Sequence, residues 1–93
     1  KQELAALMSA EMGKSLAEAL AEIDKSLTVF SYYFDLAPRI LAPQVVGSAY
    51  SESEIRKEPY GIIFAMMPWN FPVWQVVRFA VPAILSGNLV LLK

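Results

Sequence analysis

Residues 61–92 contain a single charged side chain, Arg78, and this stretch constrains the fold more than any other part of the sequence. Two apolar runs flank a segment of helical length, and we expect strands over 60–67 and 89–92. Pro72 is suited to the first turn of a helix, so we expect a helix over 73–85 that Pro82 kinks or breaks. A strand, a helix and a second continuous apolar strand are typical of one βαβ unit of a parallel sheet, with both strands buried.

A membrane segment is the alternative interpretation of this stretch, because about 20 apolar residues suffice to span a bilayer. Spanning requires unbroken backbone hydrogen bonding, and the run is interrupted by Pro68, Asn70, Pro72, Arg78, Pro82 and Ser86-Gly87-Asn88. We therefore expect no membrane association.

Composition excludes several other classes of function. The net charge of −1 provides no electrostatic footprint for nucleic acid. The sequence has no Cys and no His, which excludes disulfides and the usual metal ligands, so we expect no metal site. No targeting motif is visible, and we expect a cytoplasmic protein.

The N-terminal part predicts two helices. In residues 1–12 one helical face carries Leu4, Leu7, Met8 and Met12. Gly13 is a plausible end for this helix, with Lys14 beside it to meet the negative end of the helix dipole. Ser15 and Glu18 have the spacing of a capping box, which predicts that a second helix begins there.

The second helix has the strongest periodicity in the chain. Its apolar stripe consists of Leu16, Leu20, Ile23, Leu27, Phe30 and Phe34. Glu18, Glu22 and Lys25 occupy the opposite face, and we expect Pro38 to end the helix. A coiled coil is an alternative, but fewer than three heptads favour an ordinary helix packed on a globular core.

Residues 43–58 predict two short strands with polar faces, with a possible turn at Gly47-Ser48. A polar strand pair is not stable alone, so it needs a neighbouring sheet, possibly that of another subunit. The chain thus divides into a helical part (1–42), a strand pair (43–58) and the βαβ unit (59–93). An apolar C-terminal third, a start without Met and an end at a strand predict a piece of a larger protein.

The loop 68–72, with the sequence PWNFP, carries the residue that we single out for chemistry. Asn70 has an ordinary interpretation as a structural side chain that satisfies backbone groups in a turn. The functional interpretation is an oxyanion-hole donor, whose amide binds an oxygen that becomes negative during reaction. Trp69, Phe71 and two prolines would then stiffen the loop and exclude water.

Several spaced motifs in this chain together resemble the aldehyde dehydrogenase superfamily over essentially all of its length. They are Glu11-Met12-Gly13-Lys14, Pro59-x-Gly61, Pro68 to Pro72, Pro82-Ala83-Ile84, Gly87-Asn88 and Lys93. The resemblance implies a fragment of an aldehyde dehydrogenase-like α/β fold with a Rossmann-like parallel sheet. It also implies that 1–42 and 59–93 belong to the cofactor-binding domain, and 43–58 to the oligomerisation sheet of a dimer or tetramer.

The resemblance further implies NAD(P)-dependent oxidation of an aldehyde to a carboxylic acid. A Cys thiolate attacks the aldehyde, a hydride passes to nicotinamide, and a water activated by Glu hydrolyses the thioester. Asn70 would stabilise the oxyanion. Met67, Pro68, Trp69 and Asn70 would line the nicotinamide-ribose site, and Lys93 would bind the adenosine ribose hydroxyls, although strand-end solvation alone also explains a lysine there. The nucleophile and the base are absent from these 93 residues, so the chain alone should be inactive.

Arg78 suggests the substrate. Trp74, Gln75 and Arg78 follow Asn70 at spacings that share a helix face, and with Phe71 we assign them to substrate binding. A guanidinium in an apolar stretch favours a carboxylate partner. This charge agrees with a resemblance to the succinate-semialdehyde dehydrogenase branch. The alternatives are an Arg78 paired with an acidic residue elsewhere in the protein, another semialdehyde or a general aldehyde as substrate, and a non-catalytic helical interaction module.

Overall fold

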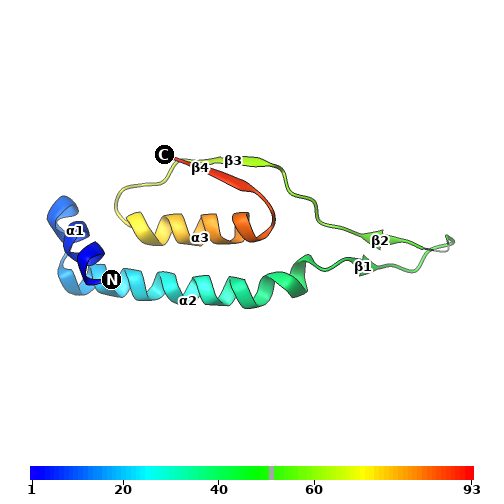
Figure 1. The fold of residues 1–93 in the computed structure, drawn as a ribbon, viewed down its shortest axis with the longest axis horizontal. Coiled ribbons are helices and arrows are strands. Elements are labelled where there is room, and N and C mark those ends of the chain that lie inside the picture. Colours follow the sequence, from blue (N-terminus) through cyan, green and yellow to red (C-terminus); the bar gives the residue numbers. More distant parts are fainter. Residues whose placement is uncertain (51) are drawn as a thin grey trace.

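The computed structural model describes residues 1–50 and 52–93. Figure 1 shows α3 lying between α2 and a pair of strands, with α1 across the start of α2 and a second strand pair projecting as an arm. This arrangement confirms the predicted α/β class with a βαβ unit. The elements are α1 (Gln2–Met12), α2 (Leu16–Leu41), β1 (Gln44–Val45), β2 (Glu54–Ile55), β3 (Ile62–Ala65), α3 (Pro72–Leu85) and β4 (Leu89–Leu92).

The junction between α1 and α2 is formed as predicted. Gly13 has a φ of 73°, and its N–H donates to the Ser9 carbonyl at 3.0 Å, which closes α1. The Ser15 hydroxyl accepts from the Glu18 N–H at 3.2 Å, and the Glu18 carboxylate accepts from the Ser15 N–H in return. Hydrogen bonding from Ser15 lowers the pKa of Glu18. The core then forms where the two helices meet α3, from Ala5, Met8, Ala19 and Ile23 with Met12, Leu20 and Val73 packed against them.

The buried face of α2 differs from the predicted one. Much of the apolar stripe is exposed, with Leu27 57% and Phe34 59% accessible. The buried residues of α2 are instead Ala19, Glu22, Ile23 and Ser26. Because Ala19 and Ser26 are small, α1 and α3 can approach this face of α2 closely. The assignment of Glu22 to a solvated face is therefore wrong, because the neighbouring helices cover that side of α2.

Pro38 does not end its helix as the sequence predicts, and Pro82 does not break α3. α2 passes through Pro38 and continues to Leu41, because a proline so near the end removes only one hydrogen bond. α3 likewise passes through Pro82 to Leu85 rather than breaking. Packing supports both ends, across an apolar hollow lined by Tyr33, Leu36, Ala37, Ile40, Leu41, Pro82, Leu85 and Ser86.

Strands β3 and β4 pair in parallel, with Ile62 opposite Leu89 and Ala65 opposite Leu92. The expectation of full burial is wrong for this chain: Ala65 is buried, but Ile62 is 72% exposed. Alternate side chains of a strand face opposite sides of the sheet, and α3 covers only one side (Figure 1).

A buried asparagine joins the end of α3 to the start of β3. The Asn88 side-chain oxygen accepts from the Gly61 N–H at 3.1 Å, and its amide donates to the Ala83 carbonyl. Gly87 has a φ of 88°, and a Cβ there would lie 3.4 Å from Pro59. These contacts explain why the Pro59-x-Gly61 and Gly87-Asn88 motifs occur together: they close the βαβ unit.

The predicted strand pair forms an antiparallel arm, with Gln44 opposite Ile55. The Ser48 hydroxyl accepts from the Tyr50 N–H in the connection between the two strands, within the predicted turn region. The arm makes the molecule long, with extents of 62 × 24 × 15 Å. Its Cα radius of gyration is 17.9 Å, against about 12 Å for a compact domain of this length. None of the helices among the described residues has the length and apolarity to cross a membrane.

Candidate functional site

The first turn of α3 is capped by a side chain of α2. Phe71, at the N-cap, forms no side-chain cap, and Pro72 follows it at the start of the helix without an N–H. Glu22 supplies the missing acceptor: its Oε1 accepts from the Val73 N–H at 3.0 Å and from the Trp74 N–H at 2.9 Å. A carboxylate at this position also interacts favourably with the positive end of the helix dipole.

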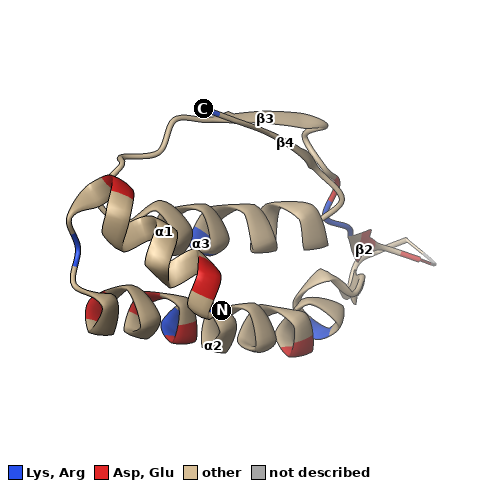
Figure 2. Cartoon of the chain, turned by 60° about the vertical axis from the view of Figure 1, so that its left-hand side comes forward, with Lys and Arg blue, Asp and Glu red and all other residues tan. Residues whose placement is uncertain are grey.

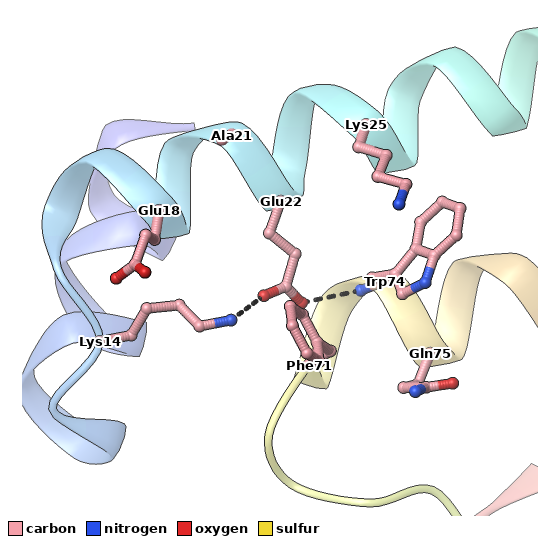
Figure 3. Close-up of a pocket in the computed structure, with 8 residues that line it drawn as sticks. All are labelled: Lys14, Glu18, Ala21, Glu22, Lys25, Phe71, Trp74 and Gln75. Carbon is pink, nitrogen blue, oxygen red and sulfur yellow. Dashed lines mark hydrogen bonds and ion pairs between the residues drawn. The ribbon is translucent and has the colours of Figure 1, made fainter.

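Lys14 connects this cap to the predicted site loop. Its Nζ lies 2.5 Å from Glu22 Oε2 and donates to the Asn70 carbonyl at 3.1 Å. It also lies 4.0 Å from the centre of the Phe71 ring, within the range of a cation–π interaction. The two charged side chains are 13% and 3% exposed, so the pair is largely desolvated. Figure 3 shows Lys14 and Glu22 reaching toward one another above Phe71.

The Glu22 carboxylate is held in its ionised form. Burial by itself raises the pKa of Glu22, but hydrogen bonds from Lys14, Trp74 and Val73, with the charge of Lys14, bring that pKa below 4.5. Buried ion pairs recover their desolvation cost only when further hydrogen bonds satisfy them, and Glu22 meets that condition with two backbone donors. The junction is therefore charged at neutral pH.

A cavity of about 500 Å³ opens beside this junction between α2 and α3. On its far side Lys25 Nζ lies 4.2 Å from the centre of the Trp74 ring. Figure 3 shows the lining side chains, which are Lys14, Glu18, Ala21, Glu22, Lys25, Phe71, Trp74 and Gln75. Figure 2 shows the contrast in charge, with coloured segments along α1 and α2 and almost none on α3, β3 and β4.

The carboxyl ends of the parallel strands form a second part of the site. The Lys93 N–H donates to the Ala65 carbonyl at 2.9 Å, and the Met67 N–H donates to the Lys93 carbonyl at 3.0 Å. The ladder thus continues past both strands and brings Met67 beside Lys93. Ligands of parallel sheets bind at this edge.

The structure brings together only some of the predicted site residues. Phe71, Trp74 and Gln75 line one cavity, whereas Met67 and Lys93 adjoin at the strand ends. Pro68 and Trp69 are exposed between these two groups, as is Asn70. Arg78 is exposed on α3 and lies outside the lining of the cavity.

The dry setting expected for Asn70 is not formed by this chain alone. Trp69 beside it is 76% exposed. Among residues 1–50 and 52–93, no group of three or more His, Cys, Asp or Glu side chains has the spacing of a metal site.

Sequence reasoning missed the role of Glu22 and assigned Lys14 only to the end of α1. Two signals in the sequence could have found them. A helix beginning at Phe71-Pro72 has no capping side chain of its own and requires an acceptor from elsewhere. Ala19 and Ser26 flank Glu22 at helical spacing, and small residues on both sides indicate a face that another helix approaches closely.

Comparison with known proteins agrees with this architecture. The model of the aldehyde dehydrogenase family matches residues 1–93. A probable succinate-semialdehyde dehydrogenase [NADP(+)] of Synechocystis is 52% identical over 93 residues, which are 100% of this chain and 20% of that protein. The chain thus spans about a fifth of the length of the curated relatives that it matches.

Solved structures give the same match. The succinic semialdehyde dehydrogenase of Streptococcus pyogenes, in complex with NADP⁺, superposes with a TM-score of 0.91 at 33% identity, over 99% of this chain and 20% of that one. A betaine aldehyde dehydrogenase of Staphylococcus aureus, in complex with NAD⁺, gives a TM-score of 0.90 at 33% identity, over 99% and 19% of the two chains.

Proposed function

The chain belongs to the aldehyde dehydrogenase family, and we propose that it is the part of a longer enzyme in which Asn70 assists the oxidation of an aldehyde to a carboxylic acid. One observation carries this proposal. Asn70 lies between the carboxyl end of β3 and the N-terminus of α3, and its carbonyl is held by the half-buried Lys14. A donor on a loop anchored in this way is preorganised toward an oxygen that gains negative charge.

Asn70 acts on an adduct formed by groups outside these 93 residues. A Cys thiolate adds to the aldehyde carbon, the carbonyl oxygen becomes an oxyanion, and the Asn70 side-chain amide donates to that oxygen. Loss of hydride from this carbon to NAD⁺ or NADP⁺, when bound, would leave a thioester. A water deprotonated by a Glu carboxylate hydrolyses this thioester, which releases the acid and restores the thiol.

The cofactor is NAD⁺ or NADP⁺, which accepts the hydride when bound. Met67, Pro68 and Trp69, with Asn70, would hold its nicotinamide-ribose half, and Lys93 would bind the adenosine ribose hydroxyls. Support comes from the backbone hydrogen bond between Met67 and Lys93. Because of it, the residues proposed for the two halves of the cofactor lie at one edge of the parallel strands. The relatives described above also support NAD⁺ or NADP⁺ as the cofactor: one is named for NADP⁺, and the two solved structures are in complex with NADP⁺ and NAD⁺.

The proposed substrate is succinate semialdehyde. Support comes from relatives that carry this activity in their names and from Arg78, whose exposed guanidinium is suited to the distal carboxylate of such a substrate. Phe71, Trp74 and Gln75 would line the path to the aldehyde. Residues 1–42 and 59–93 would belong to the cofactor-binding domain, and 43–58 to an oligomerisation sheet.

The test is a kinetic assay of the whole enzyme that contains this chain. Reduction of NAD⁺ and of NADP⁺ is followed with succinate semialdehyde, with butanal and with no aldehyde. We expect reduction that depends on aldehyde, with the highest kcat/KM for succinate semialdehyde. Preference for butanal would overturn the substrate but keep the reaction, and no reduction with any aldehyde would overturn the function.

A further inference from the structure

The charged pair at the start of α3 has no part in the chemistry proposed above, although it is the most buried charged feature of the described chain. The two backbone bonds that Glu22 accepts and the one that Lys14 donates all end on residues 70–74. We propose that Lys14 and Glu22 are positioning residues that fix the direction of the Asn70 side chain. This inference rests on the proposed function of Asn70.

The geometry restrains the loop at both of its ends. On the strand side, the Met67 N–H is tied to the Lys93 carbonyl at 3.0 Å. On the helix side, Glu22 holds the N–H groups of Val73 and Trp74. Between them Lys14 holds the Asn70 carbonyl, which fixes the peptide plane that follows the Asn70 Cα. The peptide planes set the direction of the Cα–Cβ bond, so the lysine restrains the origin and direction from which the Asn70 amide extends.

Charge makes this restraint stronger than ordinary loop packing. Glu22 pairs with Lys14 and orients its ammonium, while Phe71 covers that ammonium from one side. Glu22→Gln retains an oxygen that can accept from Val73 and Trp74 but loses the charge that holds Lys14. Lys14→Met retains most of the length of the side chain and loses the donor to Asn70. Both variants therefore keep an acceptor for the first turn of α3 and remove the restraint on the loop.

The decisive experiment is a double-mutant cycle in the whole enzyme. Lys14→Met and Glu22→Gln are each made alone and with Asn70→Ala, and kcat and KM are measured for aldehyde and cofactor. Lys1→Met, which removes an exposed lysine that pairs with Asp24, is the matched control. If Lys14 and Glu22 act through Asn70, we expect each to lower kcat by about 10-fold or more in the wild-type background and by less than about twofold beside Asn70→Ala.

A general loss of structure would behave differently, because it would lower kcat by the same factor in both backgrounds. That result would overturn the inference, as would a Lys14→Met kcat within about twofold of wild type. Lys14→Arg should restore most of kcat, since it retains a donor and a positive charge.

A second measurement does not depend on turnover and separates this inference from the proposed function. Hydrogen exchange at the amides of residues 67–75 should be faster in Lys14→Met than in wild type, while that of α1 stays unchanged. Faster exchange in an enzyme that oxidises no aldehyde would support the restraint and reject the function. Unchanged exchange in an active enzyme would reject the restraint and retain the function.

Discussion

At the scale of single residues, the identity of the substrate depends most on Arg78. Arg78 is the only charged residue of α3. It is exposed, and none of the ion pairs among the described residues includes it. An exposed guanidinium that forms no ion pair among the described residues, on a helix without another charged residue, is suited to bind an anion from outside the chain.

We expect Arg78→Leu to lower kcat/KM for succinate semialdehyde by about 10- to 150-fold, the equivalent of a charged hydrogen bond of about 1.5–3 kcal/mol. The same variant should leave butanal turnover unchanged or improved, because butanal has no carboxylate to bind. Arg39→Leu, which removes an exposed arginine near the end of α2, is the control for loss of charge. Equal losses with both aldehydes would return Arg78 to a structural role.

How far residues could be predicted depends on where their partners lie in the sequence. The family resemblance suggested roles for Asn70 and Lys93, and in the structure Lys93 lies beside Met67, as expected where parallel strands end. Glu22 was assigned to a solvated face because its partners, Val73 and Trp74, are about fifty residues away and invisible to helical periodicity. The exposure of Arg78 was also not foreseen, since an apolar sequence around it predicts burial.

At the scale of secondary structure, the start of α3 depends on a charge brought from α2. Because the pKa of Glu22 is lowered from 4.5 in the folded chain, ionised Glu22 stabilises the fold. This contribution is complete above the unfolded pKa and is lost as the pH falls through the lower, folded value.

We expect Glu22→Gln to lower the free energy of unfolding of the whole enzyme by about 1–3 kcal/mol at neutral pH, and by less as the pH falls through the lowered pKa of Glu22. Thermal or denaturant unfolding of both proteins over this pH range measures the difference. Glu11→Gln, which changes an exposed carboxylate at the end of α1, is the control. A difference that stays constant as the medium is acidified would contradict the role of the ionised carboxylate.

The elements themselves were largely predictable, and the misses have a common cause. Helix starts at Ser15 and Pro72, the stop at Gly13 and the parallel strands follow from local chemistry, and all are observed. Pro38 was expected to end its helix and Pro82 to kink or break α3. Neither helix stops at its proline, because packing between the ends of α2 and α3 outweighs one lost hydrogen bond at each. Tertiary contacts of this kind leave no periodic signal in the sequence.

At the scale of the whole molecule, the described chain leaves much apolar surface uncovered. Ile62, Phe64, Leu89 and Leu91 are all more than half exposed on the side of the sheet away from α3. A face of this kind needs a covering layer. We therefore predict that residues 1–93 in isolation form no cooperatively folded domain. Calorimetry should show no sharp unfolding transition, and a sharp one with dispersed NMR signals would contradict this.

The β1–β2 arm projects from the rest of the chain and exposes its edges (Figure 1). Val45 is 86% exposed, and two-residue strands are not stable alone. We predict that the arm pairs with another subunit in a dimer or tetramer, so Val45→Asp should shift the whole enzyme to smaller species in sedimentation. Tyr60→Asp is the control, because Tyr60 is an aromatic residue outside the arm that is 95% exposed. A monomeric, fully active wild type would reject the pairing.

The central claim is that these helices and strands hold Asn70 to stabilise a developing oxyanion, and kcat of Asn70→Ala in the whole enzyme tests it most directly. With saturating succinate semialdehyde and cofactor, we expect kcat to fall by about 10²- to 10³-fold, the equivalent of about 2.7–4 kcal/mol of barrier. Cofactor affinity should change little, because only an interaction with the reacting oxygen is removed. A kcat within about threefold of wild type would remove Asn70 from the mechanism.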